Sequence, residues 1–181
     1  MQNCALILID VQKAFNEPDW GQRNNHNAET NISDLLAFWR KKQGTVIHVH
    51  HSSKMQKSRF HPSQIGHEPK SQARPVPDEV VFKKLVNSAF IGTELERYLR
   101  DNKIEKLTIV GLTTDHCVST TVRMASNFGF EVTLVSDATA TFNKKLNGVD
   151  YTAQQIHLVH LASLNNEFCT LATTSDILAS G

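Results

Sequence analysis

The chain has 181 residues, of which 40% are hydrophobic and 20% are charged, and its formal net charge at pH 7 is +1. This length suits one domain with a sizeable core, so we expect a single domain over residues 1–181. The near-neutral charge gives no support to binding of nucleic acid or of an anionic membrane, and no apolar run approaches the roughly 18 residues of a membrane helix. Three cysteines without a CxxC pair favour a reducing compartment, and no signal-peptide pattern follows Met1. We therefore expect a soluble cytoplasmic protein.

The first predicted strand covers residues 4–9, whose sequence CALILI is continuously apolar, as in a parallel strand buried on both faces. Asp10 follows it directly, at the carboxyl end where open α/β sheets place their ligand sites. The ordinary alternative for such an Asp is a helix cap or a solvated strand end. A helical pattern over residues 28–43 and a second strand over residues 45–50 complete a strand–helix–strand unit, which favours a parallel sheet.

Residues 51–78 form the longest irregular stretch and are rich in Ser, His, Lys, Gln and Pro. In a compact domain, such a length is more often a lid or a binding loop than a linker. A short strand is predicted over residues 80–82, and Lys83 and Lys84 come directly after it. Either lysine could therefore lie at the carboxyl edge of the sheet.

The segment around which we organise the sequence is residues 108–125, TIVGLTTDHCVSTTVRMA. A strand is predicted over residues 107–110, Gly111 is expected to end it, and a helix follows with Cys117 at its beginning. Free backbone N–H groups and the positive end of the helix dipole approach a thiol in that position. Both favour the thiolate, and the N–H groups could hold a developing oxyanion. The ordinary alternative for a lone cysteine is a small buried hydrophobe.

The rest of the chain continues the alternation of strands and helices. Its predicted elements are a loop over residues 13–27, a helix that begins at a capping box of Thr93 and Glu96 and runs to about residue 101, strands over residues 131–135 and 168–172, and a helix over residues 151–164. The alternation predicts a three-layer α/β domain.

Three candidate catalytic groups follow predicted parallel strands, so they can meet at one edge of the sheet. They are Asp10, one of the two lysines and Cys117. A carboxylate, an ammonium and a thiol suffice for covalent hydrolysis of a carbonyl–nitrogen bond, without histidine as the base.

Four segments then carry a resemblance that covers residues 5–178 approximately: LILIDVQKAF, FKKLVNSAFIGTEL, IVGLTTDHCVSTTVRMA and VSDATATF. In this order and spacing the chain resembles the isochorismatase-like cysteine hydrolase superfamily. The resemblance implies a three-layer α/β/α Rossmann-like fold with a central parallel sheet. It also implies an Asp–Lys–Cys triad that hydrolyses amides by way of a thioester. Matched residue by residue, Asp10 is the general base, Lys84 rather than Lys83 is the lysine, and Cys117 is the nucleophile.

The same resemblance implies further features of the site. A non-proline cis peptide bond is expected between Leu112 and Thr113, turning the Thr113 N–H toward the Cys117 N–H to form an oxyanion hole. Phe15 resembles the family's pocket-wall aromatic and is a candidate substrate-binding residue, with simple burial in the core as the alternative. Members of the superfamily form dimers and tetramers, so we expect a homodimer or homotetramer in which a neighbouring subunit could add to the pocket wall.

Several other residues invite a functional interpretation. His48 and His50 point to one face of a strand, but no Asp lies near them as in the Asp-x-His pair of metal-binding nicotinamidases, so we expect no metal and no cofactor. His116, beside Cys117, is expected to pack or to line the pocket rather than to act as the base. Cys4 and Cys169 lie within predicted strands and are expected to be inert. The remaining candidate, Asp137, is expected to order the end of its strand.

The sequence thus predicts a metal-independent cysteine hydrolase that acts on a small amide or ureide. A nicotinamidase is the nearest alternative, because the residues around Cys117 resemble those enzymes. A catalytically idle binding or scaffold protein on the same fold is the alternative from a different class. Cleavage of the vinyl ether of isochorismate, for which the family does not need the cysteine, is disfavoured by the intact Cys117.

Overall fold

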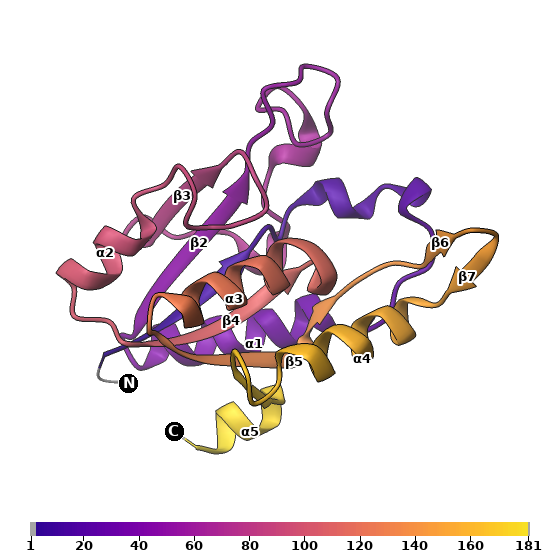
Figure 1. Ribbon diagram of the computed structural model, residues 1–181. Helices are drawn as coiled ribbons and strands as arrows, with labels where there is room; N and C mark the ends of the chain where they lie inside the picture. The colour runs from indigo at the N-terminus through magenta and orange to yellow at the C-terminus, as the bar shows by residue number, and fades with distance from the viewer. Residues whose placement is uncertain (1–2, 181) are drawn as a thin grey trace.

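The computed structural model describes residues 3–180, which fold into a parallel sheet covered by helices on both faces (Figure 1). The sheet has six strands in the order β3-β2-β1-β4-β5-β8, and every neighbouring pair is parallel. The strands are β1 (Cys4–Ile9), β2 (Thr45–His51), β3 (Val80–Lys84), β4 (Lys106–Leu112), β5 (Glu131–Ala140) and β8 (Thr170–Ala172). The expected three-layer α/β/α fold is confirmed.

The helices divide between the two faces according to the alternation of side chains along β1. Leu6 and Leu8 pack with α1 (Ala28–Lys41) and the C-terminal α5 (Thr174–Ala179). Ala5, Ile7 and Ile9 pack on the other side in a cluster that includes α2 (Leu95–Asp101), α3 (Ser119–Asn127) and α4 (Ala153–Leu164). Because both faces of β1 are covered, its sequence is continuously apolar rather than alternating.

The strand order reverses at β1, which lies between β2 and β4. In open α/β sheets, ligands bind outside the carboxyl ends of the strands at such a switch point. Asp10 lies there, with a backbone φ of 50° and its N–H donated to the carbonyl of Val49 (2.8 Å). This left-handed conformation turns the chain away from the strand.

Strand β4 is longer than the sequence predicted, and the expectation that Gly111 ends it is wrong. The strand continues through Gly111 to Leu112, with a shift of register against β5 between Ile109 and Gly111. Gly111 has a φ of 125°, and a Cβ at this position would collide with the carbonyl oxygen of Ile9 in the neighbouring strand. The glycine therefore permits a close approach of β4 to β1.

The capping box expected at Thr93 and Glu96 is also wrong. Helix α2 begins at Leu95, and the Thr93 hydroxyl donates instead to the carbonyl of Ala89 (2.6 Å). Capping boxes are present at two other helices. Thr152 and Gln155 form one at the start of α4, and Thr173 and Asp176 form the other at the start of α5.

Two elements were not predicted. One is α5, and the other is a hairpin of β6 (Lys144–Leu146) and β7 (Val149–Tyr151), whose turn places Asn147 and Gly148 at positive φ. The stretch 51–78 is irregular as expected apart from short 3-10 turns at Ile65–His67 and Ser71–Ala73. The predicted loop 13–27 likewise contains 3-10 turns at Lys13–Asn16 and Pro18–Trp20. No helix within residues 3–180 is both long and apolar enough to cross a bilayer.

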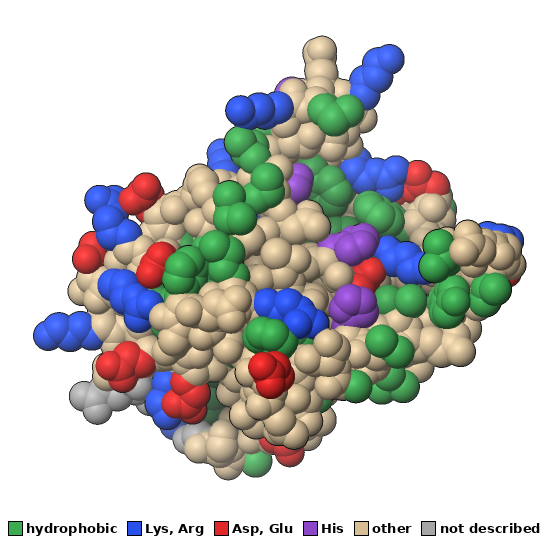
Figure 2. All heavy atoms as spheres, in the orientation of Figure 1, with side chains coloured by type: hydrophobic (Ala, Val, Ile, Leu, Met, Phe, Trp, Pro, Cys, Tyr) green, Lys and Arg blue, Asp and Glu red, His purple; other side chains and the backbone are tan. Residues whose placement is uncertain are grey.

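Hydrophobic side chains gather on the surface of the β6–β7 hairpin and α4 (Figure 2). Leu146, Val149, Leu158 and Val159 are all exposed there. The predicted homodimer or homotetramer stays a prediction.

Candidate active site

Asp10 and Lys84 form a buried ion pair at the carboxyl edge of the sheet. Lys84 Nζ lies 2.6 Å from Asp10 Oδ2, and the two side chains are 0% and 1% exposed. Strand β2 lies between β1 and β3, so the Lys84 side chain crosses the end of β2 to reach Asp10. Lys83 is exposed, so the structure brings Lys84 rather than Lys83 to Asp10, as the sequence motif implied.

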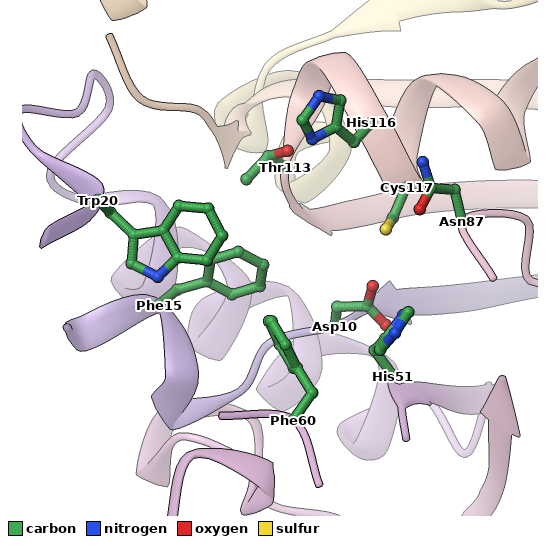
Figure 3. A pocket seen from close by; sticks show the side chains of 9 residues that line it. All are labelled: Asp10, Phe15, Trp20, His51, Phe60, Asn87, Thr113, His116 and Cys117. Atoms are coloured by element: carbon green, nitrogen blue, oxygen red, sulfur yellow. The ribbon is translucent and has the colours of Figure 1, made fainter. Parts of the chain in front are cut away.

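Cys117 lies in a widened helical turn, Thr114–Val118, that leads directly into α3. The turn is closed by bonds that span five residues, from Val118 N–H to the carbonyl of Thr113 and from Ser119 N–H to that of Thr114. Such insertions into a helix are frequent at functional sites. The Sγ atom points toward Asp10 (Figure 3) and lies within 4.8 Å of a carboxylate oxygen of that residue.

The environment of Cys117 holds its thiol in the protonated form. Burial and then the Asp10 carboxylate raise the pKa of Cys117 to about 12, although the Lys84 ammonium lowers it. This differs from the expectation that the start of the helix and a nearby lysine would favour a resting thiolate. Desolvation of a buried charge and repulsion from Asp10 outweigh the attraction of the Lys84 ammonium.

Asp10 is poised to accept a proton. Burial raises its pKa, while the charge of Lys84 and the hydrogen bond from it lower the pKa. Its Oδ2 accepts from Lys84, whereas its buried Oδ1 has no hydrogen-bond partner among residues 3–180. A buried carboxylate oxygen without a partner is unusual and leaves room for a proton from the adjacent thiol.

Asp10 and Cys117 open onto a pocket of about 150 Å³, whereas Lys84 lies behind Asp10 and does not line it. Its lining residues are Asp10, Phe15, Trp20, His51, Phe60, Asn87, Thr113, His116 and Cys117 (Figure 3). The aromatic rings form one wall, with Phe15 centred 5.3 Å from Trp20 and 5.2 Å from Phe60. Phe15 is also part of the hydrophobic cluster beneath α1. Phe15 therefore both lines the pocket and packs in the core. Its role in substrate binding stays a prediction.

The peptide bond between Leu112 and Thr113 is cis, as the resemblance implied. Thr113 is buried and lines the pocket together with Cys117. The oxyanion hole formed by the N–H groups of these two residues stays a prediction.

The sequence of the chain matches a known protein family. The isochorismatase domain model matches residues 4–176. The chain belongs to the isochorismatase family. It is similar to the isochorismatase family protein YrdC of Bacillus subtilis, with 49% identity over 175 residues that cover 96% of this chain and 94% of YrdC.

Two further relatives place the chain among the hydrolases of this family. A solved structure of an isochorismatase-family protein from Chromobacterium violaceum is 41% identical, has a TM-score of 0.97 and is matched over 99% of this chain and 94% of that one. Nicotinamidase 3 of Arabidopsis thaliana is 32% identical over 145 residues, which cover 80% of this chain and 66% of the relative. The protein is thus an isochorismatase-family hydrolase.

Within residues 3–180, the cluster of possible metal ligands in the active site of this isochorismatase-family hydrolase does not fit a metal ion. Asp10, His51 and Cys117 offer three donor atoms within 4.8 Å of one another. However, the Lys84 ammonium already lies 2.6 Å from Asp10 Oδ2 and 3.3 Å from His51 Nδ1. A divalent cation on these donors would lie against that positive charge, and the cysteine would have to be deprotonated.

His48 and His50 have structural roles in the hydrolase. His48 Nε2 lies 2.9 Å from Glu79 Oε2, and Arg40 binds both oxygens of the same carboxylate (2.7 and 2.8 Å). Burial lowers the pKa of His50 to about 4, so its ring is neutral at pH 7. Neither residue lines the pocket of Cys117.

The other candidate residues follow their expected roles with small differences. His116 lines the pocket with a side chain that is 54% exposed. Burial raises the pKa of both Cys4 and Cys169, which keeps their thiols protonated, although Cys169 precedes β8 rather than lying within it. Asp137 Oδ1 accepts from the N–H and the hydroxyl of Thr174, so it joins β5 to the start of α5.

The sequence patterns gave no catalytic or pocket-lining role to His51, Trp20, Phe60 or Asn87. His51 ends β2 at the same edge of the sheet as Asp10, so the rule that selected Asp10 also applies to it. Trp20 and Phe60 come from the two long irregular stretches, where no periodicity predicts which side chains turn inward.

Proposed function

We propose that this isochorismatase-family hydrolase cleaves a C–N bond of a small amide or ureide through a thioester on Cys117, with Asp10 and Lys84 as its partners. The observation that carries the proposal is the buried ion pair of Asp10 and Lys84, whose one free carboxylate oxygen lies beside a protonated thiol. A thiol with a pKa of about 12 needs a base within reach in order to become a nucleophile.

In the first half of the reaction, Sγ attacks the carbonyl carbon of the substrate while its proton moves to Asp10. The carbonyl oxygen becomes an oxyanion, for which the N–H groups of Thr113 and Cys117 are the candidate donors. When the C–N bond breaks, Asp10 gives the proton to the leaving nitrogen, and the acyl group stays on Cys117 as a thioester.

In the second half, water attacks the thioester carbon and gives a proton to Asp10. The C–S bond breaks, the proton returns to Sγ, and the carboxylic or carbamic acid leaves. Asp10 thus exchanges one proton in each half, and the enzyme ends as it began. Histidine is not needed as a base in either half.

Lys84 supports both halves without transferring a proton. Its charge lowers the pKa of Asp10 and also lowers the pKa of Cys117. It therefore opposes the effect of burial, which favours the protonated form of Asp10. Its Nζ also lies 3.2 Å from the carbonyl oxygen of Val86, which fixes the side chain in place.

The size of the pocket supports a small substrate. Its volume of about 150 Å³ is below the range of about 300–1,000 Å³ that is typical of sites for drug-sized ligands. The aromatic wall of Phe15, Trp20 and Phe60 suits a flat or apolar group beside the scissile bond. Nicotinamide is a second candidate substrate, favoured by the similarity to a nicotinamidase over 80% of this chain.

The test is ammonia or amine release from a panel of small amides and ureides that includes nicotinamide, with Cys117→Ala as the matched control. We expect release from at least one compound by the wild type only, with an acyl adduct on Cys117 in the intact mass spectrum. Release that persists in Cys117→Ala would contradict the proposal. If no compound of the panel released ammonia or amine and Cys117 did not react, the catalytically idle scaffold would be favoured.

A further inference from the structure

His51 is a pocket residue that the proposed reaction leaves without a role. It is the last residue of β2, and its ring lies beside Asp10 in the pocket (Figure 3). A ring nitrogen of His51, a carboxylate oxygen of Asp10 and Sγ of Cys117 all lie within 4.8 Å of one another. The three side chains therefore line the same pocket and lie close enough together to contact one small molecule there.

The backbone of His51 is fixed by a fully buried side chain. Gln12 Oε1 accepts from the His51 N–H (2.8 Å), and Gln12 Nε2 donates to the His51 carbonyl (3.1 Å). The same Nε2 donates to the carbonyl of His67 (2.8 Å), so the Gln12 amide joins β2 to the loop that follows it. A buried amide used in this way holds one residue of the pocket in place.

The contacts of the His51 ring determine where its proton lies. Lys84 Nζ is 3.3 Å from Nδ1, and an ammonium can only donate, so Nδ1 accepts and the neutral ring carries its proton on Nε2. Burial and the charge of Lys84 lower the pKa of His51, which keeps the ring neutral at pH 7. The ring also packs edge to face on Phe60, with centroids 5.2 Å apart. No other residue within 3–180 hydrogen-bonds the ring, so the Nε2–H is a free donor at the pocket.

We infer that His51 is a catalytic residue whose Nε2–H binds and orients the water that hydrolyses the thioester, an inference that rests on the proposed function. The oxygen of this water accepts from Nε2–H and donates one hydrogen bond to Asp10. Its O–C bond forms as its proton passes to Asp10, the C–S bond breaks, and Asp10 returns the proton to Sγ. His51 keeps its own proton throughout and acts by position rather than as a base.

This role separates the two halves of the reaction. In acylation the nucleophile is Sγ and its base is Asp10, and both are held by the protein itself. In deacylation the nucleophile is a mobile water that must be held before it can attack. Loss of the His51 donor therefore slows deacylation more than acylation.

The test uses p-nitrophenyl acetate, an activated ester that acylates a thiol without requiring the unknown natural substrate. His51→Phe keeps an aromatic ring against Phe60 but removes the donor, and His51→Gln keeps an N–H donor. The burst of p-nitrophenolate measures acylation, its steady release measures deacylation, and intact mass spectrometry measures the acetyl adduct on Cys117.

For His51→Phe we expect a burst rate within about 3-fold of the wild type and steady release that falls by about 10-fold or more, with accumulation of the adduct. His51→Gln should recover part of the steady rate, and hydroxylamine, a stronger nucleophile than water, should restore turnover in His51→Phe. Equal slowing of burst and steady release, no slowing of either, or a His51→Gln enzyme as slow as His51→Phe would overturn the inference. A folded wild type with neither burst nor Cys117 adduct would instead overturn the proposed function, and this inference would fall with it.

Discussion

Two buried carboxylates of this hydrolase are paired with cations in different ways. Glu29, on α1, receives Arg23 on both oxygens (2.8 and 3.0 Å) and Lys70 Nζ on Oε1 (2.6 Å). Asp10 receives Lys84 on Oδ2 alone and keeps a buried Oδ1 without a partner among residues 3–180. The pKa of Glu29 is lowered because its hydrogen bonds and cations outweigh burial, whereas the pKa of Asp10 is raised because burial outweighs its single cation.

This difference indicates how a structural carboxylate is distinguished from one that exchanges protons. A carboxylate whose oxygens are all bonded is held in its charged form and has no oxygen ready for a proton. A carboxylate with one cation and one free oxygen has its pKa raised by burial and keeps an oxygen that can accept a proton from a neighbour. Burial and an ion pair alone, which both residues share, do not identify the base.

The largest expected effect comes from removing the base. Asp10→Asn should lower kcat/KM on the true substrate by roughly 10²-fold to 10⁴-fold, the usual contribution of a positioned general base. It should do so even though loss of the carboxylate lowers the pKa of Cys117 and makes thiolate easier to form. Steady-state kinetics measure this effect.

The matched control for the base is Glu29→Gln, which removes the other buried carboxylate. We expect its kcat/KM to stay within about 3-fold of the wild type, because Glu29 does not line the pocket. If Asp10→Asn and Glu29→Gln lost activity equally, the distinction between the two carboxylates would fail.

Removal of the single cation should destabilise the fold. Lys84→Met leaves the Asp10 carboxylate buried without a counter-charge, at a cost of about 3–5 kcal/mol at pH 7. The loss should shrink in the double variant Lys84→Met with Asp10→Asn, in which no charge remains. Urea denaturation measures the free energy of unfolding, and a double variant as unstable as Lys84→Met would argue against an uncompensated charge as the cause.

At Glu29 the corresponding change should be milder. Lys70→Met removes one of two cations and leaves Arg23 on both oxygens, so we expect a loss of about 1–3 kcal/mol with turnover preserved. The same urea titration gives this value. A loss as large as that of Lys84→Met would show that a second cation does not protect a buried carboxylate.

The two carboxylates should also respond to pH with opposite signs. The stability that Glu29 contributes is present above its unfolded pKa of about 4.5 and is lost as the pH falls through its lowered folded pKa. The contribution of Asp10 is present below its unfolded pKa of about 3.8 and is lost as the pH rises through its raised folded pKa.

Unfolding free energies measured from about pH 3 to pH 8 test this sign. The difference between the wild type and Glu29→Gln should grow with pH, and the difference between the wild type and Asp10→Asn should shrink. If both differences in unfolding free energy changed with pH in the same direction, the assignment of the two pKa shifts would be contradicted.

The sequence was sufficient to predict the parts of the site that follow regular strands. Asp10 and Cys117 were placed at one edge of the sheet because the apolar runs before them predicted buried parallel strands, whose carboxyl ends meet there. The alternatives of a helix cap for Asp10 and a buried thiol for Cys117 stayed open until the resemblance was considered. The choice of Lys84 over Lys83 needed the resemblance, because both lysines end the same strand.

Other parts depend on contacts that periodicity does not encode. Trp20 and Phe60 reach the pocket from irregular segments, and the need for a glycine at position 111 arises from the close approach of Ile9 in the neighbouring strand. The sequence indicated influences that lower the pKa of Cys117 but not the burial and the nearness of Asp10, which raise it. By contrast, Asn147-Gly148 is a hairpin signal that was present in the sequence and not used.

The most direct test of the proton transfer from Cys117 to Asp10 is an ultraviolet titration of thiolate, taken as the wild type minus Cys117→Ala. We predict no Cys117 thiolate in the wild type below about pH 10, and a titration shifted to lower pH in Asp10→Asn. A wild-type protein in which Cys117 is already ionised at pH 7 would contradict the account, because the carboxylate would then have no proton to accept.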